Sequence, residues 1–468
     1  MTIRLFALWV AIAVTPAFAR DWYVNHETGA DAATGEAQQP FRSIALAIKS
    51  AGPGDTIHLA PTGTPYREVA SFYNKSGEAG RPITLDGHGA VLSGAEPLDP
   101  ARWEQVTGGL YRGAPPVSGD AAVIGRWFFL IDGRVQRMGR SLKGPHSAWK
   151  AADALAPGQW TWNEKEGMFY LRTPGDRPLG ECGIRAPIRS NGVALSGSCE
   201  HLVIRNLTAT HVYNDGFNIH GYSRDILFEN VLAVECGDDG ISAHDDCTIE
   251  VRGMVSTGNS TGACHAGKSR TTSERMVIAG NHGYDYFVLN TGAHVLRDSR
   301  ILCDAAQSLV VIGDQEEGAV CTLALDNVLL QGAGASSMIK ANRNSVVNVS
   351  RCTFLNLSLP VAGESFSLRQ SVVAGAPKPY IVIYEHTHWT AASNLYDLTY
   401  LRVGDTFYKP ETFADYRTAT GRDSDSLWTS VQFIDRSDGS FTPTEPVHEV
   451  GVIPSRLPEA IVSREADE

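Results

Sequence analysis

After its first 19 residues the sequence lacks any apolar run long enough to cross a bilayer, which argues against a membrane span. It also lacks an excess of basic residues: 40 Lys and Arg stand against 52 Asp and Glu, for a formal net charge of −12. This acidic balance argues against nucleic acid or an anionic membrane as a partner. The eight cysteines include no CxxC pair, which argues against a zinc site.

The first 19 residues are typical of a cleavable secretory signal. Arg4 precedes an apolar run, and small residues close the segment at Ala17-Phe18-Ala19. We therefore expect an exported protein, located in the periplasm or the extracellular medium. An even number of cysteines in an exported chain permits disulfides, although Cys also packs well as a small apolar residue inside narrow coils.

A 23-residue repeat runs through the middle of the chain, with five consecutive units from about 201 to 315. The units begin at His201, Arg224, Cys247, Arg270 and Ala293. Short runs such as VIRNLT alternate apolar and polar residues between Gly, Asn and Asp turns, with no helical periodicity. Strands that recur at this spacing without a crossover helix stack on their counterparts in the next unit. The sequence therefore predicts an all-β chain that forms a parallel β-helix solenoid.

Five segments are predicted along the chain. They are a signal peptide (1–19), an N-terminal cap with the first coils (20–99), an inserted Trp-rich β subdomain (100–185), regular coils (186–394) and a closing segment with a tail (395–468). The cap contains an amphipathic stretch from Phe41 to Ala51, expected to be a helix that covers the open end of the solenoid. Trp127, Trp160 and Trp162 are expected to fill the core of the insert.

Two stretches resemble segments of a known group. The run PFRSIALAIKSAGPGDTIHLAPTGTPYRE and the stretch from Phe413 to Gly451 are similar to the first and closing segments of secreted bacterial right-handed parallel β-helix proteins of the pectate-lyase-like superfamily. The resemblance implies a right-handed solenoid with an N-terminal helical cap and a small inserted β subdomain that forms one wall of a cleft. It also implies a carbohydrate-active protein, because the superfamily contains lyases, hydrolases, epimerases and glycan-binding proteins.

Three histidines are predicted on one outer sheet face of three adjacent coils. Alternation along their strands puts His220, His244 and His265 outward. Stacked strands lie about 4.8 Å apart, so this cluster would span about 10 Å. The polar residues around it are Asp215, Asp238 and Asp239 before the strands, Asn218 within one, Asp245, Asp246, Lys268 and Arg270 after them, and Tyr284, Tyr286 and Asn290 one coil on.

The first chemistry that this cluster supports is β-elimination on an acidic, uronate-containing polysaccharide. His244 would be the base, and His265 or Tyr286 the proton donor. Lys268 and Arg270 would bind the uronate carboxylate, and Asp239 is a further catalytic candidate. Candidates for substrate binding are His220, Asp215, Asn218, Tyr284 and Asn290. Asp238, Asp245 and Asp246 could hold Ca²⁺, which suits carboxylate ligands.

A related possibility is uronate epimerisation. The tract from Gly240 to Asp246 resembles the Gly-Ile/Phe-Asp-Pro-His-Asp motif of mannuronan C5-epimerases and related alginate lyases. His244 and Asp245 stand at the motif's His and final Asp, whereas Ser242 and Ala243 replace its Asp-Pro.

The second chemistry is hydrolysis of a glycosidic bond by paired carboxylates. Asn214-Asp215-Gly216 and Asp238-Asp239 are similar to the Asn-Thr-Asp and Asp-Asp motifs of polygalacturonase-type hydrolases. The Thr of that family is missing here, no Gly-His-Gly stands at Thr261-Gly262-Ala263, and no Arg-Ile-Lys follows downstream. A binding protein without catalysis would carry aromatic platforms on many coils, and the regular units have few outward aromatics. The lyase interpretation gives a role to more of these residues than hydrolysis or binding does, so we predict a monomeric polysaccharide lyase.

Overall fold

The structure is a computed structural model that describes residues 19–141, 143, 146–303, 308–313, 318–333, 338–434, 442–444 and 450–459. Residues 1–18 of the predicted signal peptide and the last nine residues of the tail lie outside this range. Within the described part of the chain, no helix is both long and apolar enough to cross a membrane.

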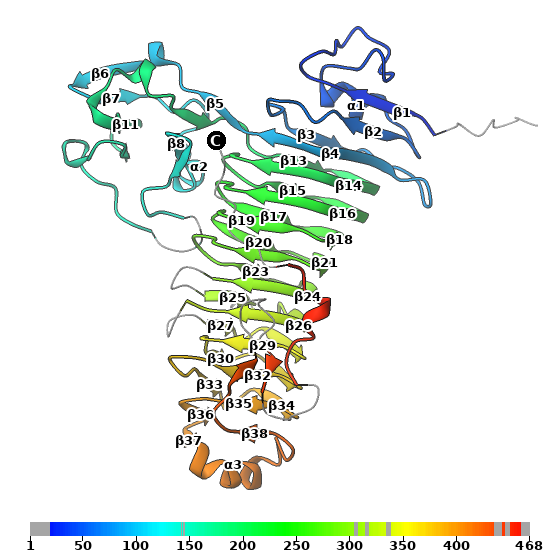
Figure 1. Cartoon of the computed structure of the whole chain (residues 1–468), viewed down its shortest axis with the longest axis vertical. Coiled ribbons are helices and arrows are strands. Elements are labelled where there is room, and N and C mark those ends of the chain that lie inside the picture. The colour runs from blue at the N-terminus through cyan, green and yellow to red at the C-terminus, as the bar shows by residue number, and fades with distance from the viewer. Residues whose placement is uncertain are drawn as a thin grey trace, which may run out of the picture.

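Long parallel sheets stacked coil upon coil form the body of the molecule (Figure 1). The predicted all-β solenoid is therefore confirmed. The sheet that carries the site consists of β3 (Ala70–Tyr73), β13 (Val193–Ser196), β15 (Phe217–Ile219), β17 (Asp239–Ala243), β20 (Thr261–His265), β23 (Tyr286–Val288), β25 (Ser308–Ile312), β27 (Met338–Ala341), β30 (Leu359–Val361), β33 (Tyr380–Ile383), β36 (Tyr400–Val403) and β37 (Thr406–Tyr408). Its strands pair in parallel except for the terminal pair β36 and β37.

The second long sheet closes the remaining sides of each coil. It consists of β1 (Asp21–Val24), β2 (Thr56–Leu59), β4 (Ile83–Ser93), β14 (Ser198–Thr210), β16 (Tyr222–Val234), β18 (Asp246–Arg252), β19 (Val255–Thr257), β21 (Arg270–Glu274), β22 (Val277–Ala279), β24 (Ala293–Leu302), β26 (Cys321–Gln331), β28 (Ser345–Ser350), β29 (Thr353–Leu355), β31 (Ser365–Arg369), β32 (Val372–Ala374), β34 (His388–Ala392), β35 (Leu395–Tyr396) and β38 (Leu427–Trp428). One continuous apolar core runs inside both sheets, and the eight cysteines are buried as free thiols.

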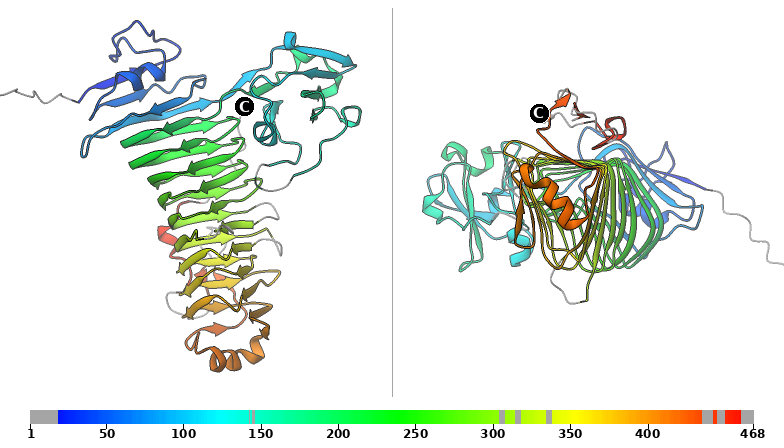
Figure 2. Two further views of the ribbon diagram at one scale, coloured as in Figure 1. Left: turned by 180° about the vertical axis from the view of Figure 1, so that it is seen from behind. Right: turned by 90° about the horizontal axis from the view of Figure 1, so that it is seen from below.

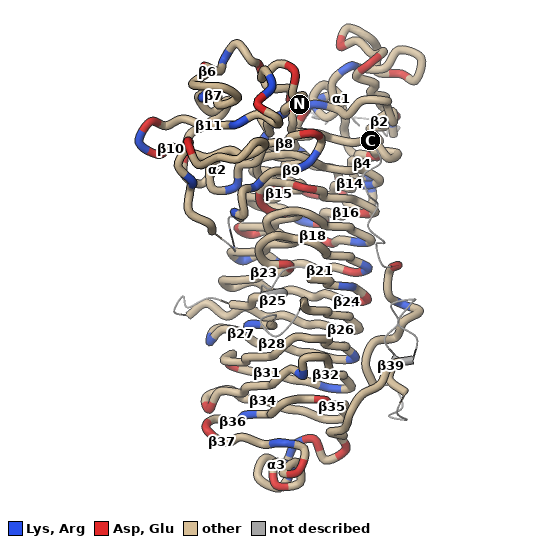
Figure 3. Tube along the Cα trace, turned by 60° about the vertical axis from the view of Figure 1, so that its left-hand side comes forward, with Lys and Arg blue, Asp and Glu red and all other residues tan. Residues whose placement is uncertain are grey.

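Helices lie at both ends of the solenoid. Helix α1 (Ile44–Ser50) packs on β1, β2 and β3, and Ser43 caps it by accepting a hydrogen bond from the Leu46 backbone N–H. Helix α3 (Phe413–Thr420) lies across the opposite end, as the view along the solenoid shows (Figure 2). Charged residues of both signs are interspersed along the coil turns (Figure 3).

An insert interrupts the coils between β4 and β13 and stands beside the N-terminal end of the solenoid (Figure 2). It contains two antiparallel sheets. The first consists of β6 (Trp103–Thr107), β7 (Leu110–Gly113), β10 (Trp160–Asn163) and β11 (Met168–Arg172). The second consists of β5 (Ala95–Pro97), β8 (Phe129–Ile131), β9 (Arg134–Gln136) and β12 (Arg185–Pro187). The short helix α2 (Ala121–Gly125) lies between them in the chain. Trp127, Trp160 and Trp162 are buried in the apolar core of this insert, as the sequence predicts.

The coils are not all 23 residues long, and this overturns the predicted outward orientation of His265. Phe217 pairs with Ile241, Ile241 with Ala263, and Ala263 with Tyr286, so successive coils are 24, 22 and 23 residues long. Because side chains alternate along a strand, the short coil moves His265 from the predicted outer face into the core, level with Ala243. The predicted outward His265 is wrong, and Tyr286 likewise points inward and is fully buried.

A ladder of glycines brings the coils close together beside the site. Gly192, Gly216, Gly240 and Gly262 occupy the same position in successive coils, each directly before an inward-facing residue. A Cβ atom at any of the four would lie between 2.1 and 2.8 Å from a neighbouring atom. Such distances leave no room for a side chain at these four positions.

Replacing Gly240 with Ala is expected to destabilise the protein by about 1–3 kcal/mol, the usual cost of overpacking a well-packed interior. The new methyl group would lie 2.1 Å from Ser256 Oγ and 2.6 Å from the Gly262 carbonyl oxygen. These two atoms are themselves joined by a hydrogen bond of 2.7 Å. The midpoint of urea denaturation measures the effect. The control is Gly63→Ala, because nothing lies within 4 Å of a Cβ there, and equal losses in both variants would contradict the prediction.

Candidate active site

The turns before β13 and β15, and the first residue of β17, carry polar side chains that tie each coil to the next. Asn191, Asp215 and Asp239 directly precede the ladder glycines of three successive coils. The Oδ1 atom of Asn191 accepts a hydrogen bond from the Asp215 backbone N–H at 3.3 Å. The Oδ1 atom of Asp215 accepts one in turn from the Asp239 backbone N–H at 3.0 Å. The repeat thus stacks two aspartates directly above one another.

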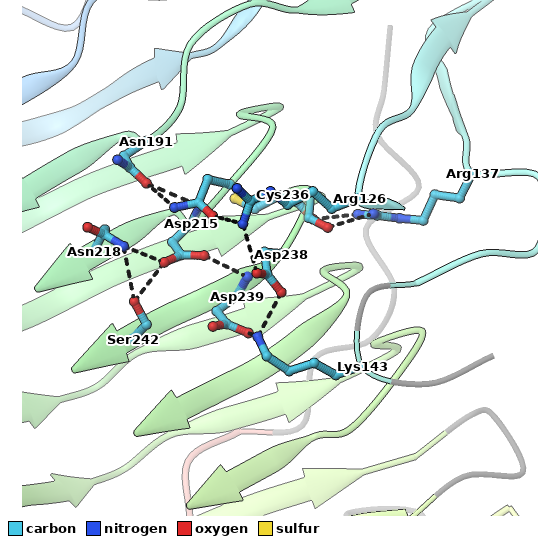
Figure 4. A network of polar contacts seen from close by, with 12 residues as sticks. Arg126, Arg137, Lys143, Asn191, Asp215, Asn218, Cys236, Asp238, Asp239 and Ser242 are labelled. Carbon is cyan, nitrogen blue, oxygen red and sulfur yellow. Dashed lines mark hydrogen bonds and ion pairs between the residues drawn. The ribbon is translucent and has the colours of Figure 1, made fainter. Parts of the chain in front are cut away.

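Asp215, Asp238 and Asp239 form a buried group that we name the carboxylate cluster (Figure 4). One carboxylate oxygen from each residue lies within 4.8 Å of the others, and the three residues are only 2–4% exposed. Buried like charges at this distance repel strongly, so the cluster requires cations, bound protons or both.

The insert supplies those cations. Lys143 Nζ lies 2.8 Å from Asp238 Oδ1 and 2.6 Å from Asp239 Oδ1. Arg126 Nη1 lies 3.2 Å from Asp238 Oδ2. Arg137 donates hydrogen bonds to the backbone carbonyls of Cys236 and Gly237, and so holds the turn directly before Asp238. The site is therefore built where the insert meets the solenoid.

Two members of the cluster retain protons more strongly than ordinary aspartates. Burial, and after it the charge of Asp238, raises the pKa of Asp239 well above the usual value, although Lys143 opposes this. Burial and Asp238 also raise the pKa of Asp215. Burial alone would lower the pKa of Lys143, but Asp239 and the other nearby acidic groups hold it well above its usual value. The cluster can therefore hold a transferable proton beside a permanent ammonium charge.

Asp215 is fixed by hydrogen bonds on both of its oxygens. Its Oδ2 atom accepts from Ser242 Oγ at 2.7 Å and from Asn218 Nδ2 at 2.6 Å, and its Oδ1 atom accepts from the Asp239 backbone. A carboxyl whose two oxygens both accept is poorly placed to donate a proton. We therefore assign Asp215 to positioning and Asp239 to proton transfer.

Two of the three predicted histidines do lie together on the outer face. The rings of His220 and His244 are stacked, with centroids 4.4 Å apart, and His220 Nδ1 lies 3.2 Å from Asp245 Oδ2. Burial, and after it His220 and Lys143, lowers the pKa of His244 to about 4, so this imidazole is neutral near neutral pH. A ring nitrogen of His244 lies within 4.8 Å of an Asp239 oxygen and of Cys264 Sγ.

The other predicted site residues are placed differently. His265 and Tyr286 are in the core, where their rings are 5.8 Å apart, so neither can reach a substrate on the outer face. Lys268 lies in the turn that follows β20, and Arg270 comes directly after that turn. Both residues are exposed, and among the described residues neither has an ion pair to the cluster. Asn290 Oδ1 accepts from the Gly267 backbone N–H, which is a turn-stabilising contact. Tyr284 is half-buried and packs against Phe287.

The predicted calcium ligands are not brought together. Asp238 precedes β17, whereas Asp245 and Asp246 follow it and are exposed, bonded to His220 and Arg224. The strand therefore separates the predicted ligands, and that grouping is wrong. Within the described residues, the carboxylate cluster offers an alternative set of three oxygens, but the Lys143 ammonium already contacts two of its members. We therefore assign the cluster to proton transfer.

Sequence reasoning found the aspartates but missed Arg126, Arg137 and Lys143. The aspartates belong to the repeat, and its period brings them together. The three cations belong to the insert, whose position relative to the coils no period encodes. The feature of the sequence that could have indicated these cations is the density of basic residues between 126 and 143, next to a repeat that is rich in aspartate.

The chain is similar in part to one protein family and, distantly, to several solved structures. Residues 27–75 match a family model described as a protein of unknown function (DUF1565). No curated protein matches the chain. Similar solved structures include one described as the complex structure of XylC with xylose, at 13% identity over 82% of this chain and 69% of that chain, with a TM-score of 0.47. A glycoside hydrolase follows at 10% identity over 83% and 95%, with a TM-score of 0.46. A rhamnogalacturonan lyase is similar at 9% identity over 93% and 96%, with a TM-score of 0.28. Likenesses this distant assign neither an activity nor a substrate to this chain.

Proposed function

We propose that this protein is a carbohydrate-active enzyme that hydrolyses glycosidic bonds at the carboxylate cluster. The observation that carries this proposal is the buried group of Asp215, Asp238 and Asp239, in which burial and Asp238 raise the pKa of Asp239 well above its usual value beside Lys143. Glycoside hydrolases need one carboxyl that donates a proton and a second that acts as a base or nucleophile. In such enzymes the surroundings of the two carboxyls separate their pKa values, so that one carboxyl is protonated while the other is ionised.

In this mechanism Asp239 donates its proton to the glycosidic oxygen as the bond from that oxygen to the anomeric carbon breaks. The Asp238 carboxylate either attacks the anomeric carbon or takes a proton from the water that attacks it. Arg126 and Lys143 keep the Asp238 carboxylate in place through their ion pairs. We expect the sugar chain to approach along the outer faces of β15 and β17, where Asn218, His220 and His244 are partly exposed.

A second candidate is β-elimination on a uronate-containing polysaccharide, or C5-epimerisation by the same removal of the α-proton. One observation favours it: His244 is a neutral imidazole on a partly exposed face, stacked on His220. A neutral imidazole can accept the proton α to a uronate carboxyl. In that case His244→Ala would abolish turnover.

The test is a screen of the purified protein against neutral and uronate-containing polysaccharides, with reducing ends and near-ultraviolet absorbance followed in parallel. Hydrolysis produces new reducing ends without new absorbance, which is the result we expect. New absorbance together with new ends means an unsaturated uronate, and would replace hydrolysis by the elimination assigned to His244. Binding without new ends on every polysaccharide would overturn both enzymatic proposals in favour of a glycan-binding protein.

A further inference from the structure

The coil that begins at β20 has a polar interior. Its neighbours in the stack are the coil of β17 and the coil of β23 (Figure 1). In the second long sheet, the coil of β17 directs Ile249 and Val251 into the core, whereas the coil of β20 has Thr271 and Ser273 at the paired positions. Polar side chains therefore replace apolar ones in the middle of a core that is otherwise apolar.

Two histidines lie in this polar interior. His265 of β20 and His294 of β24 are 0% and 2% exposed, and their rings are stacked with centroids 5.4 Å apart. His294 Nδ1 lies 3.0 Å from Thr271 Oγ1. His294 Nε2 and both ring nitrogens of His265 are buried without a hydrogen-bond partner among the described residues. A protonated imidazole donates from both nitrogens, so each ring would need an acceptor that the core does not offer.

The groups around the two rings offer no negative charge. The titratable groups that face them are His244 from β17, Tyr286 from β23 and, next to Tyr286, the Cys321 thiol from β26. Strand β21 contributes the hydroxyls of Thr271 and Ser273. The buried carboxyl of Asp285 stands at the other end of β23 and accepts a hydrogen bond from Asn281. Among the described residues, a proton on either ring would thus have no counter-ion.

Burial in these surroundings keeps both imidazoles neutral. Burial, and after it His294 and His244, holds the pKa of His265 well below its usual value. Burial lowers the pKa of His294 to about 3. An imidazole in the unfolded chain titrates near pH 6.5, so below this pH the unfolded chain binds two protons that the folded protein does not bind. The contribution of these two groups to stability is therefore lost progressively as the pH falls below about 6.5.

We propose that the pair of buried histidines is an acid-sensitive switch that opens the solenoid beside the candidate active site. A proton on either ring requires that β20, β23 and β24 separate and admit water, because a buried charge without a counter-ion is too costly to keep. Strand β20 pairs directly with β17, the strand that begins with Asp239, so opening removes one neighbour of the carboxylate cluster. The switch itself does not rest on the proposed function, whereas its effect on turnover does.

The test replaces both histidines with the apolar residues of the next coil, as His265→Val together with His294→Leu. Val288 and Leu323 stand at the paired positions one coil on, so this geometry accommodates both side chains. Urea denaturation at pH 6 and pH 5 gives the unfolding constant of each protein. Over this interval the constant of the parent is expected to rise about 60-fold more than that of the double variant, because two fewer imidazoles titrate in the variant. An equal rise in both proteins would overturn the proposal.

A surface histidine and a measurement on the parent complete the design. The matched control is His388→Gln, because His388 is exposed in β34, and its unfolding constant should follow that of the parent. NMR of the parent with ¹³C-labelled histidine tests the switch even if the double variant does not fold. The ring signals of His265 and His294 should remain those of neutral imidazoles until the protein unfolds. A ring that takes up its proton in the folded protein would contradict the switch.

Turnover distinguishes this proposal from the proposed function. If the parent hydrolyses a polysaccharide, the double variant is expected to keep its activity to a lower pH than the parent does. Increased acid resistance of the double variant, in a protein that cleaves no polysaccharide, would leave the switch standing and overturn hydrolysis alone. Hydrolysis that ends at the same acid limit in the parent and the double variant would overturn the switch and leave hydrolysis standing.

Discussion

Replacing Asp239 with Asn is expected to lower the rate of glycosidic hydrolysis by about 10²–10⁴-fold, the usual contribution of a general acid. The amide has the size of the carboxyl group but cannot transfer a proton to the leaving oxygen. Because burial and Asp238 raise the pKa of Asp239, the folded protein favours the protonated form of this side chain, and an uncharged amide imitates that form. The fold should therefore survive, and circular dichroism should match that of the parent.

The matched control is Asp225→Asn, because Asp225 lies in β16 of the other long sheet and its side chain is 73% exposed. Its rate should stay within about twofold of the parent, as expected for an exposed side chain outside the cluster. The parent rate should also fall as pH rises through the raised pKa of Asp239, since the acid is active only when protonated. Equal losses in the two variants, or an unchanged rate in Asp239→Asn, would contradict the assignment of the general acid.

The solenoid was predictable because each coil obeys local rules that the sequence repeats. Alternating residues define the strands, and Gly, Asn and Asp define the turns. The same local rules brought Asp215, Asp238 and Asp239 to neighbouring turns. The register was less predictable, because a coil of 22 residues among coils of 23 and 24 exchanges inward and outward positions. This change of register is the reason that His265 lies in the core.

The cations of the site show a different limit of sequence reasoning. Lys143 is 95 and 96 residues away from the two aspartates that it contacts. Nothing periodic joins the insert to the coils, so its packing against the solenoid depends on tertiary contacts that a single sequence does not display. Lys268 and Arg270 were predicted as the cations of the site, instead of Lys143, because they lie inside the repeat. Proximity within a repeat therefore predicts stacking between coils, but it does not predict what an inserted segment brings to them.

Replacing Lys143 with Met is expected to destabilise the protein by about 3–5 kcal/mol, the usual cost of removing one partner from a buried ion pair. The side chains of Asp238 and Asp239 are 6% and 3% exposed and would lose the ammonium that contacts both. Urea denaturation measures the loss, and Lys165→Met is the control, since Lys165 is exposed and has no ion pair among the described residues.

A double-mutant comparison and the pH dependence of stability distinguish the loss of the Lys143 charge from the loss of its packing contacts. In the Asp238→Asn, Asp239→Asn background the buried charges are gone, so Lys143→Met should cost much less there than in the parent. In the parent background, loss of Lys143 raises the pKa of the cluster further, so the folded state binds protons that the unfolded chain releases. Stability therefore decreases as pH rises above the unfolded aspartate pKa of about 3.9, and the cost of Lys143→Met should increase with pH. A cost that is the same in both backgrounds and at every pH would mean that Lys143 acts through packing, and the electrostatic account of the cluster would then be wrong.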